Sequence, residues 1–369
     1  MEKIRLDVIT MDAVPNYGSV LQAFATKKIL ENNGFDVTVI DYCREDVSYD
    51  NLVDTWAHGN LAKSIAITPT IKRWKKIFCN FRKKYLNLTP VTYTTEQEFE
   101  RYKSDAKAYC VGSDQVWNSK WNNGIIKPLY LSFVSSTDYK FSFSSSFGQD
   151  WLTENEVNST VKYINQFRRL SVREDTGLNI LRKQYRRSDA VRLLDPTLLL
   201  SADEWRKIAP EVKEKKYILI YNLNRSKEFD DYAMKLSKKT GLKLVRFCTR
   251  YDQFYRPGKS LLIPDVEKFI SYIDNATYVL TDSFHATAFS INLETEPICI
   301  MPPEFSNRLN DFLKLVQCEN RIVKNYRDFH VIENRVDYNV IRIILNEERQ
   351  KAQTYIEKVY SDILDSKFK

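Results

Sequence analysis

One histidine in this sequence stands where acid–base chemistry is expected. His285 follows Tyr278-Val279-Leu280, an apolar run typical of a buried strand, and then Thr281, Asp282 and Ser283, which favour the start of a helix. Helix N-termini attract anions because their N–H groups are unpaired and the helix dipole is positive there. His285 therefore suits both phosphate binding and proton donation. The alternative interpretation is a histidine that only caps the helix.

Polar residues also crowd the end of a predicted strand in the first half of the chain. Residues 108–111 form an apolar run that leads into Ser113, Asp114 and Gln115. Parallel sheets carry their ligand sites at the carboxyl ends of strands. We therefore expect Asp114 to act as a base or a charge stabiliser, and Ser113 and Gln115 to contact substrate.

A second strand of the same half ends in a charged pair. Residues 170–172 are followed by Arg173 and Glu174. Neighbouring arginine and glutamate residues on a surface are usually solvated and contribute little. At the end of a strand beside a pocket, however, Arg173 would bind a carboxylate or phosphate through two nitrogens, and Glu174 would be a candidate base.

The elements that must position these residues alternate between strand and helix. Residues 4–11, 20–33 and 37–42 predict a βαβ unit, whose crossover loop holds the substrate-binding candidates Asn16, Tyr17 and Gly18. This loop lacks the GxGxxG pattern, so a dinucleotide is not indicated.

The alternation restarts in the second half of the chain, which predicts an α/β protein with two domains. We place an N-terminal domain at residues 1–208, a C-terminal domain with the His285 motif at 209–335, and a long C-terminal helix at 336–369.

Composition excludes several classes of protein. The 369 residues are 43% hydrophobic, and the six cysteines form no C-x-x-C pair, so we expect free thiols in a reducing compartment and neither a zinc site nor any other metal site. The N-terminal residues predict a strand rather than a signal peptide, and no run is long enough to span a membrane. The predicted location is the cytoplasm.

Residues 61–88 hold eight basic residues and no acidic one. Within 71–85, apolar and aromatic residues recur at helical spacing, which predicts a basic amphipathic helix. We expect this helix to give peripheral contact with the anionic inner face of a membrane, the alternative being a surface helix with a core-facing stripe. Nucleic acid is not expected, because no motif that reads it is present.

Six segments taken together resemble the polysaccharide pyruvyl transferase family. In order they are Asn16-Tyr17-Gly18-Ser19-Val20-Leu21-Gln22-Ala23, Val111-Gly112-Ser113-Asp114-Gln115-Val116-Trp117-Asn118, Ser146-Phe147-Gly148, Ser171-Val172-Arg173-Glu174, Asp195-Pro196-Thr197 and Thr281-Asp282-Ser283-Phe284-His285. The resemblance implies two facing Rossmann-like domains of the GT-B type with the active site in the cleft between them. It also implies phosphoenolpyruvate as donor, with no further cofactor, and a sugar of a surface polysaccharide or its lipid-linked precursor as acceptor. The product would be a pyruvate ketal, with release of phosphate.

These implications assign roles to the candidate residues. His285 would protonate the vinyl carbon of the donor, Asp282 or Asp114 would stabilise the cationic centre, and Asp114 or Glu174 would be the base. Some members carry arginine where this chain has Ser283, so the donor's charge would fall to Arg173 and Arg308. We expect His285 and Arg173 to face each other across the cleft.

Two other functions remain open. A GT-B glycosyltransferase with a nucleotide-sugar donor would place a diphosphate at the same helix N-terminus. A sugar- or membrane-binding module without catalysis would not need His285.

Overall fold

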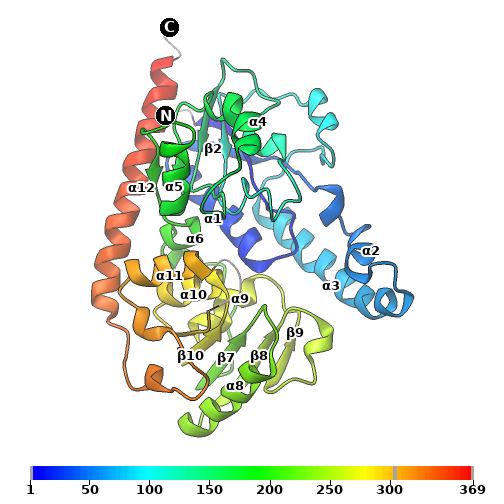
Figure 1. The fold of residues 1–369 in the computed structure, drawn as a ribbon, viewed down its shortest axis with the longest axis vertical. Helices are drawn as coiled ribbons and strands as arrows, with labels where there is room; N and C mark the ends of the chain where they lie inside the picture. Colours follow the sequence, from blue (N-terminus) through cyan, green and yellow to red (C-terminus); the bar gives the residue numbers. More distant parts are fainter. Residues whose placement is uncertain (1–2, 302–305, 367–369) are drawn as a thin grey trace. The chain divides into compact units, whose positions relative to one another are not determined.

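The computed structural model describes residues 3–301 and 306–366, and it divides the chain into two compact units (Figure 1). The first unit comprises Met1–Asn60, Phe78–Leu199 and Glu348–Lys369, and the second comprises Leu61–Ile77 and Leu200–Glu347. Each unit is built on a parallel sheet, and a long helix ends the chain. The predicted α/β class is confirmed.

The first unit holds a parallel sheet of four strands in the order β2-β1-β3-β4. Bridges from Phe141 to Arg169 and from Ser145 to Val172 join it to the strand pair β5-β6. The strands are β1 (Ile4–Ile9), β2 (Phe35–Val39), β3 (Ala108–Val111), β4 (Tyr139–Ser142), β5 (Ser171–Val172) and β6 (Val191–Arg192). The α-helices are α1 (Tyr17–Asn32), α2 (Leu52–Ala57), α4 (Glu154–Ile164), α5 (Asp175–Lys183) and α6 (Pro196–Leu199). Short 3₁₀ helices are η1 (Glu45–Val47), η2 (Gln97–Arg101) and η3 (Lys127–Tyr130).

The second unit holds a parallel sheet of five strands in the order β11-β10-β7-β8-β9. The strands are β7 (Tyr217–Tyr221), β8 (Lys243–Cys248), β9 (Lys259–Leu262), β10 (Tyr278–Thr281) and β11 (Glu296–Cys299). The helices are α7 (Ala202–Arg206), α8 (Lys227–Thr240), α9 (Glu267–Asp274), α10 (Phe284–Asn292) and α11 (Ser306–Leu315), with 3₁₀ turns η4 (Tyr251–Gln253), η5 (Glu319–Arg321) and η6 (His330–Ile332). Its central strands β7 and β10 are almost wholly buried. Their apolar sequences suit this position, because a parallel sheet is covered by helices on both faces.

The boundary between the units falls at Leu199 and Leu200, ahead of the predicted boundary at residue 208. The difference arises because α7 packs on the second unit. The buried indole of Trp205 meets the ring of Phe289 at 4.8 Å between centroids, and the Asn292 amide donates to the carbonyl of Leu200 at 2.8 Å.

The predicted terminal helix is present as α12 (Tyr338–Ser366), the long red helix of Figure 1. The clustering divides it between the units at Glu348, so it is not a separate domain. In the first unit, Tyr355 donates to the carbonyl of Ser142 at 2.7 Å, and Glu348 accepts from Arg192 at 3.0 Å. The C-terminal two-thirds of this helix is therefore part of the first unit's core.

The basic segment forms one helix, α3 (Leu61–Tyr85), and Pro69 lies inside it rather than ahead of it. The first part, to Ile77, belongs to the second unit and the rest belongs to the first. The predicted apolar stripe is buried at Ile71, Trp74, Phe78 and Phe81. This stripe packs on protein, as the alternative interpretation held, and does not supply the apolar surface expected for a membrane contact.

One basic residue of α3 is a buried structural charge of the first unit. The Arg82 guanidinium donates from Nε to Asp12 at 2.8 Å and also pairs with Asp41. Burial raises the pKa of Asp12, although Arg82 opposes that rise. Since two carboxylates depend on one guanidinium, removing it would leave uncompensated charge in the core.

We expect Arg82→Met to lower the free energy of unfolding by about 3–5 kcal/mol, because Asp12 and Asp41 would lose their counter-ion. Urea denaturation followed by circular dichroism measures this loss. The matched control is Lys83→Met, which removes the exposed neighbouring charge and should change stability by less than about 0.5 kcal/mol. Equal effects of the two substitutions would contradict the role given to Arg82.

Candidate active site

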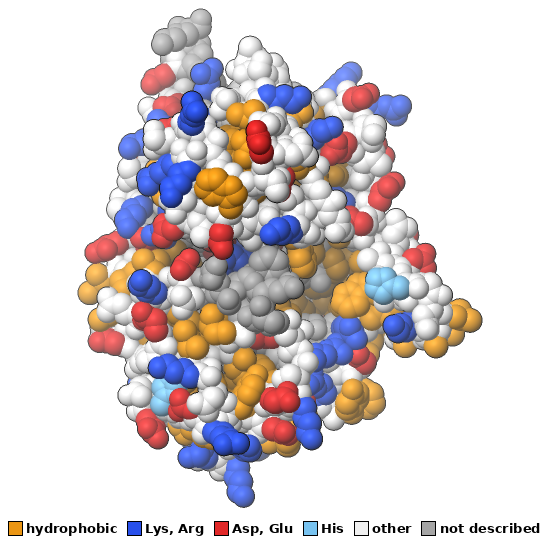
Figure 2. Space-filling model, in the orientation of Figure 1, with side chains coloured by type: hydrophobic (Ala, Val, Ile, Leu, Met, Phe, Trp, Pro, Cys, Tyr) orange, Lys and Arg blue, Asp and Glu red, His pale blue; other side chains and the backbone are white. Residues whose placement is uncertain are grey.

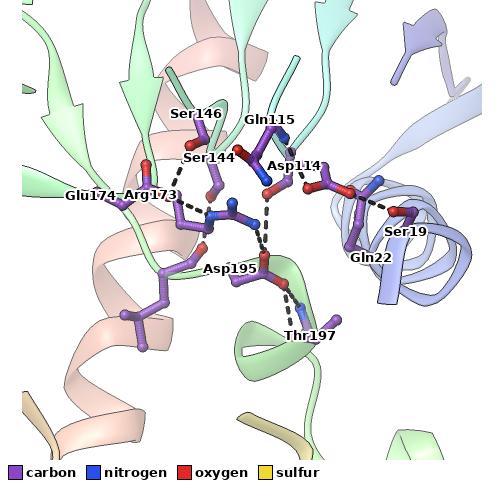
Figure 3. Close-up of polar contacts among 12 residues, drawn as sticks. Ser19, Gln22, Asp114, Gln115, Ser144, Ser146, Arg173, Glu174, Asp195 and Thr197 are labelled. Carbon is purple, nitrogen blue, oxygen red and sulfur yellow. Dashed lines mark hydrogen bonds and ion pairs between the residues drawn. The ribbon is translucent and has the colours of Figure 1, made fainter. Parts of the chain in front are cut away.

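The carboxyl ends of the first unit's strands meet in a buried polar network (Figure 3). Its centre is Asp195, which follows β6 and is wholly buried. One oxygen of Asp195 accepts from Arg173 NH1 at 2.6 Å, and the other accepts from the backbone N–H and the hydroxyl of Thr197 at 3.0 and 2.7 Å. The hydroxyl of Ser113, after β3, also donates to Asp195 at 3.4 Å.

Arg173 is buried between two carboxylates rather than presented as an open fork. Its Nε donates to Glu174 at 2.9 Å while NH1 holds Asp195, and its side chain is 3% exposed. These two acidic groups together with Asp114 raise the pKa of Arg173 above its ordinary value against the opposing effect of burial. The sequence predicts that Arg173 binds the carboxylate or phosphate of the donor. In the structure its guanidinium instead binds Glu174 and Asp195 and so positions these two carboxylates.

Glu174 is held on one side only. Its Oε1 accepts from Arg173 and, at 2.8 Å, from the hydroxyl of Ser146 after β4. Its Oε2 is buried and has no hydrogen-bond partner within residues 3–301 and 306–366. The carboxylate is thus oriented by two donors and retains one acceptor oxygen.

Asp114 sits in a strained turn after β3. Its φ of +74° lies in the left-handed region, which few residue types other than glycine, asparagine and aspartate adopt. One oxygen accepts from the hydroxyl of Ser19 at 2.7 Å and the other from the N–H of Gln115 at 2.9 Å. Asp114 therefore ties the end of β3 to the first turn of α1, and both of its oxygens are engaged.

The predicted loop at Asn16, Tyr17 and Gly18 forms the N-terminus of α1. The Asn16 side chain caps the helix by accepting from the N–H groups of Gly18 and Ser19 at 2.8 and 3.3 Å. Tyr17 is 2% exposed and its ring packs on Phe78, with the centroids 5.2 Å apart. In this structure these residues build the helix start, and their contact with substrate stays a prediction.

His285 lies at the second position of α10 in the second unit, where the sequence predicts it. Ser283 is the N-cap, and its hydroxyl accepts from the N–H of Ala286 at 3.4 Å. The imidazole is half-buried beside the ring of Phe284, at 5.4 Å between centroids. This places a titratable group at the positive end of a helix, as phosphate binding and proton donation require.

Asp282 fastens the His285 motif to the neighbouring strand. Its two oxygens accept from the N–H groups of Leu223 and Asn224, at 2.7 and 2.8 Å, in the loop after β7. Burial raises the pKa of Asp282, and these two hydrogen bonds oppose that rise. Both oxygens are used in positioning the motif, so its predicted role beside a cationic centre would have to act through its charge alone.

Arg308 brings a positive charge to the same motif. Its guanidinium lies over the ring of Phe284, 5.7 Å from the centroid, and Phe284 also packs on Phe312 of α11. Phe284 is thus shared between His285 and Arg308. The structure brings His285, Ser283, Asp282 and Arg308 together in the second unit, and Ser113, Asp114, Gln115, Arg173 and Glu174 together in the first.

Asp195 is the residue of this network that sequence reasoning missed. Asp195-Pro196-Thr197 is one of the six segments of the resemblance, but its aspartate reads as a strand breaker before proline. The feature that could have indicated it is its position directly after a strand, which it shares with the other polar residues of the network.

A model of the polysaccharide pyruvyl transferase family matches residues 16–302, which hold every site residue named above except Arg308. The chain belongs to this family. Family membership supports a transferase of polysaccharide biosynthesis. No curated protein matches the sequence.

Solved structures place this pyruvyl transferase family member in the GT-B fold. A UDP-N-acetylglucosamine 2-epimerase from Rickettsia bellii aligns with a TM-score of 0.52 at 11% identity, covering 99% of this chain and 98% of that one. The Methanocaldococcus jannaschii UDP-GlcNAc 2-epimerase gives 0.51 at 14% identity, over 97% and 99%. The glycotransferase of kitacinnamycin gives 0.50 at 9% identity, over 99% of each chain. At these identities the likeness concerns the fold alone, and the GT-B prediction is confirmed.

Within residues 3–301 and 306–366, no three histidine, cysteine or acidic side chains are grouped to hold a metal ion. Nor does a helix of this part of the chain have the length and apolar character to cross a membrane. The predicted independence from metals stays a prediction.

We expect Gly148→Ala to disturb the first unit's network. Gly148 has a φ of +58°, and an added Cβ would overlap the side chains of Gln115 and Asn118, both of which are buried. The loss of stability should exceed that of Gly59→Ala by about 1–3 kcal/mol. Gly59 is the matched control, because its φ of +75° carries the same backbone strain while its surroundings are open. Thermal unfolding and turnover measure the effect, and equal losses in the two variants would contradict it.

Proposed function

We propose that this protein transfers the pyruvyl group of phosphoenolpyruvate to two hydroxyls of a sugar in a surface polysaccharide or its lipid-linked precursor. The observation that carries the proposal is His285 in the first turn of α10, with the Arg308 guanidinium on the adjoining Phe284 ring. A proton donor and a cation at a helix N-terminus match a substrate that is anionic and must be protonated on carbon.

The chemistry balances with the chain's own residues. His285, when protonated, gives its proton to the methylene carbon of phosphoenolpyruvate, so that C2 becomes electrophilic. One sugar hydroxyl adds to C2, the bond from C2 to the phosphate oxygen breaks, and the second hydroxyl closes the ketal. Of the two hydroxyl protons, one restores His285 and the other leaves with phosphate.

The donor's negative charge is assigned to Arg308 and to the N–H groups at the start of α10. Arg308 lies in the same unit as His285 and packs on the residue beside it. Arg173, which is enclosed by Glu174 and Asp195, is assigned to positioning instead.

Glu174 is the proposed base: it accepts the hydroxyl proton that then leaves with phosphate. Both oxygens of Asp114 accept hydrogen bonds, whereas Glu174 keeps Oε2 without a partner in the part of the chain that the structure describes. The Arg173 Nε and the Ser146 hydroxyl hold Oε1, so the carboxylate is oriented while Oε2 is left to accept the proton.

We expect His285→Ala to lower phosphate release from phosphoenolpyruvate by at least about 100-fold, since it removes the proton donor. The fold should persist, because the ring is half-buried and the helix keeps its Ser283 cap. Phosphate release and the mass of the glycoside product are the measurements. The control is His58→Asn at an exposed left-handed position, which asparagine tolerates.

Phosphate release by His285→Ala at near wild-type rates would exclude the proton-donor role. The alternative function, a glycosyltransferase with a nucleotide-sugar donor, rests on the GT-B neighbours. Stabilisation of the wild-type protein by uridine diphosphate, with none by phosphoenolpyruvate, would favour that alternative.

We further propose that the first half of α3 contacts an anionic membrane. Leu61 and Ile65 lie one turn apart and are 76% and 67% exposed, and no acidic residue occurs between Leu61 and Ile77. Figure 2 shows hydrophobic and basic side chains together over this segment. Exposed aliphatic side chains on a segment whose charged residues are all basic match an anionic lipid surface.

The double variant Leu61→Asp and Ile65→Asp should weaken binding to vesicles rich in phosphatidylglycerol by about tenfold or more. Co-sedimentation measures the bound fraction, with phosphatidylcholine vesicles as the neutral reference. Ile343→Asp is the matched control, because Ile343 is an equally exposed aliphatic residue of α12. Equal binding of all three proteins would refute the membrane contact.

A further inference from the structure

A cavity of about 340 Å³ lies in the second unit beside the first turn of α8. Its volume is within the range of pockets that bind small molecules. Six residues from the loops after β7 and β8 and from α8 line it, namely Arg225, Lys227, Asp230, Tyr255, Arg256 and Pro257.

Positive charge outweighs negative charge around this cavity. Asp252 is shared by Arg225 and Arg250, and Asp230 is shared by Arg246 and Arg256. Of the residues that line the cavity, Arg225, Lys227 and Arg256 are positive and one, Asp230, is negative. Lys227 adds a further positive charge with no ion pair in the part of the chain that the structure describes, while Glu228 and Asp231 on α8 do not line the cavity. The surplus favours an anionic ligand.

Arg256 supplies a donor that lacks an acceptor. Its side chain is 10% exposed, its Nε donates to Asp230 at 2.7 Å, and its NH2 donates to the carbonyl of Ser226, the N-cap of α8, at 3.0 Å. Its NH1 is buried and has no hydrogen-bond partner within residues 3–301 and 306–366. A buried donor of this kind is costly unless a ligand oxygen meets it.

Aromatic side chains stand at the same cavity. Tyr255 lines it and is 74% exposed, and Phe254 beside it is 65% exposed, with the two rings edge to face at 5.6 Å. The two rings together present an exposed apolar surface at the cavity. Beside a cationic cavity, they suit the apolar face of a sugar whose neighbouring group is anionic.

The cavity is connected to the His285 motif through one loop. Asp282, three residues before His285, holds the N–H groups of Leu223 and Asn224, and Arg225 follows directly. The loop that holds Asp282 therefore also contributes Arg225 to the cavity, within a single unit.

We propose that this cavity binds the phosphate or diphosphate group of a phosphorylated glycan acceptor, with Tyr255 packing on the adjoining sugar. The inference rests on the proposed function, which requires a glycan acceptor. A free sugar phosphate and a lipid-linked sugar diphosphate share this chemistry, and the test distinguishes them.

The test is calorimetric binding to the full-length protein. The probes are inorganic pyrophosphate, N-acetylglucosamine 1-phosphate, geranyl diphosphate and uridine diphosphate. Lys227→Glu should raise the Kd of pyrophosphate by about tenfold or more, because it replaces an attractive charge with a repulsive one. Lys235→Glu, the same change at an exposed position further along α8, should leave the Kd within about twofold. Tyr255→Ala should weaken the sugar phosphate and spare pyrophosphate.

Each outcome bears on the proposal. Tighter binding of geranyl diphosphate than of N-acetylglucosamine 1-phosphate would indicate a lipid-linked sugar diphosphate as the ligand. The reverse order would indicate a free sugar phosphate. Binding of none of the probes, or equal losses in Lys227→Glu and Lys235→Glu, would overturn the site. If uridine diphosphate binds more tightly than the other probes and Lys227→Glu abolishes that binding, the cavity is a nucleotide site and not a site for the acceptor phosphate. Pyrophosphate binding without turnover of phosphoenolpyruvate would refute the proposed function, whereas turnover without binding would refute only this cavity's role.

Discussion

A single buried guanidinium holds together the strand ends of the first unit. Arg173 follows β5 and pairs with Glu174 beside it and with Asp195 after β6, while Ser146 after β4 and Ser113 after β3 donate to the same two carboxylates. Charges this deep are stable only when they are paired and hydrogen-bonded. The positions of the loops are therefore set jointly, because moving one strand end would leave a charge of another without its partner.

In the second unit, backbone hydrogen bonds and a helix cap hold the His285 motif in place. Asp282 binds two backbone N–H groups of the loop after β7, and Ser283 caps α10. These contacts place His285 at the helix N-terminus, next to Phe284, whose ring also contacts Arg308. One loop thus carries the link from the histidine motif to the cationic cavity at Arg225.

The basic helix α3 shows why charge in a sequence is ambiguous. Arg73 pairs with Asp265 and Arg82 with Asp12 and Asp41, so two of its arginines are structural. The aromatic stripe that suggested a membrane surface is buried in protein. The spacing of apolar residues shows which face of a helix is covered, but a core and a lipid surface demand the same spacing. The exposed aliphatic residues Leu61 and Ile65 lie outside the stripe and are the ones that bear on lipid contact.

The sequence by itself determined the α/β class, most of the strands and helices, and the place of His285 in the first turn of a helix, because period and capping are local properties. Only the tertiary structure decided what each polar residue does. Asp195 and Arg173 take their partners from segments distant in the chain, and the unit boundary depends on where Trp205 packs. Partnership between distant residues is a consequence of strand order, and no local pattern encodes it.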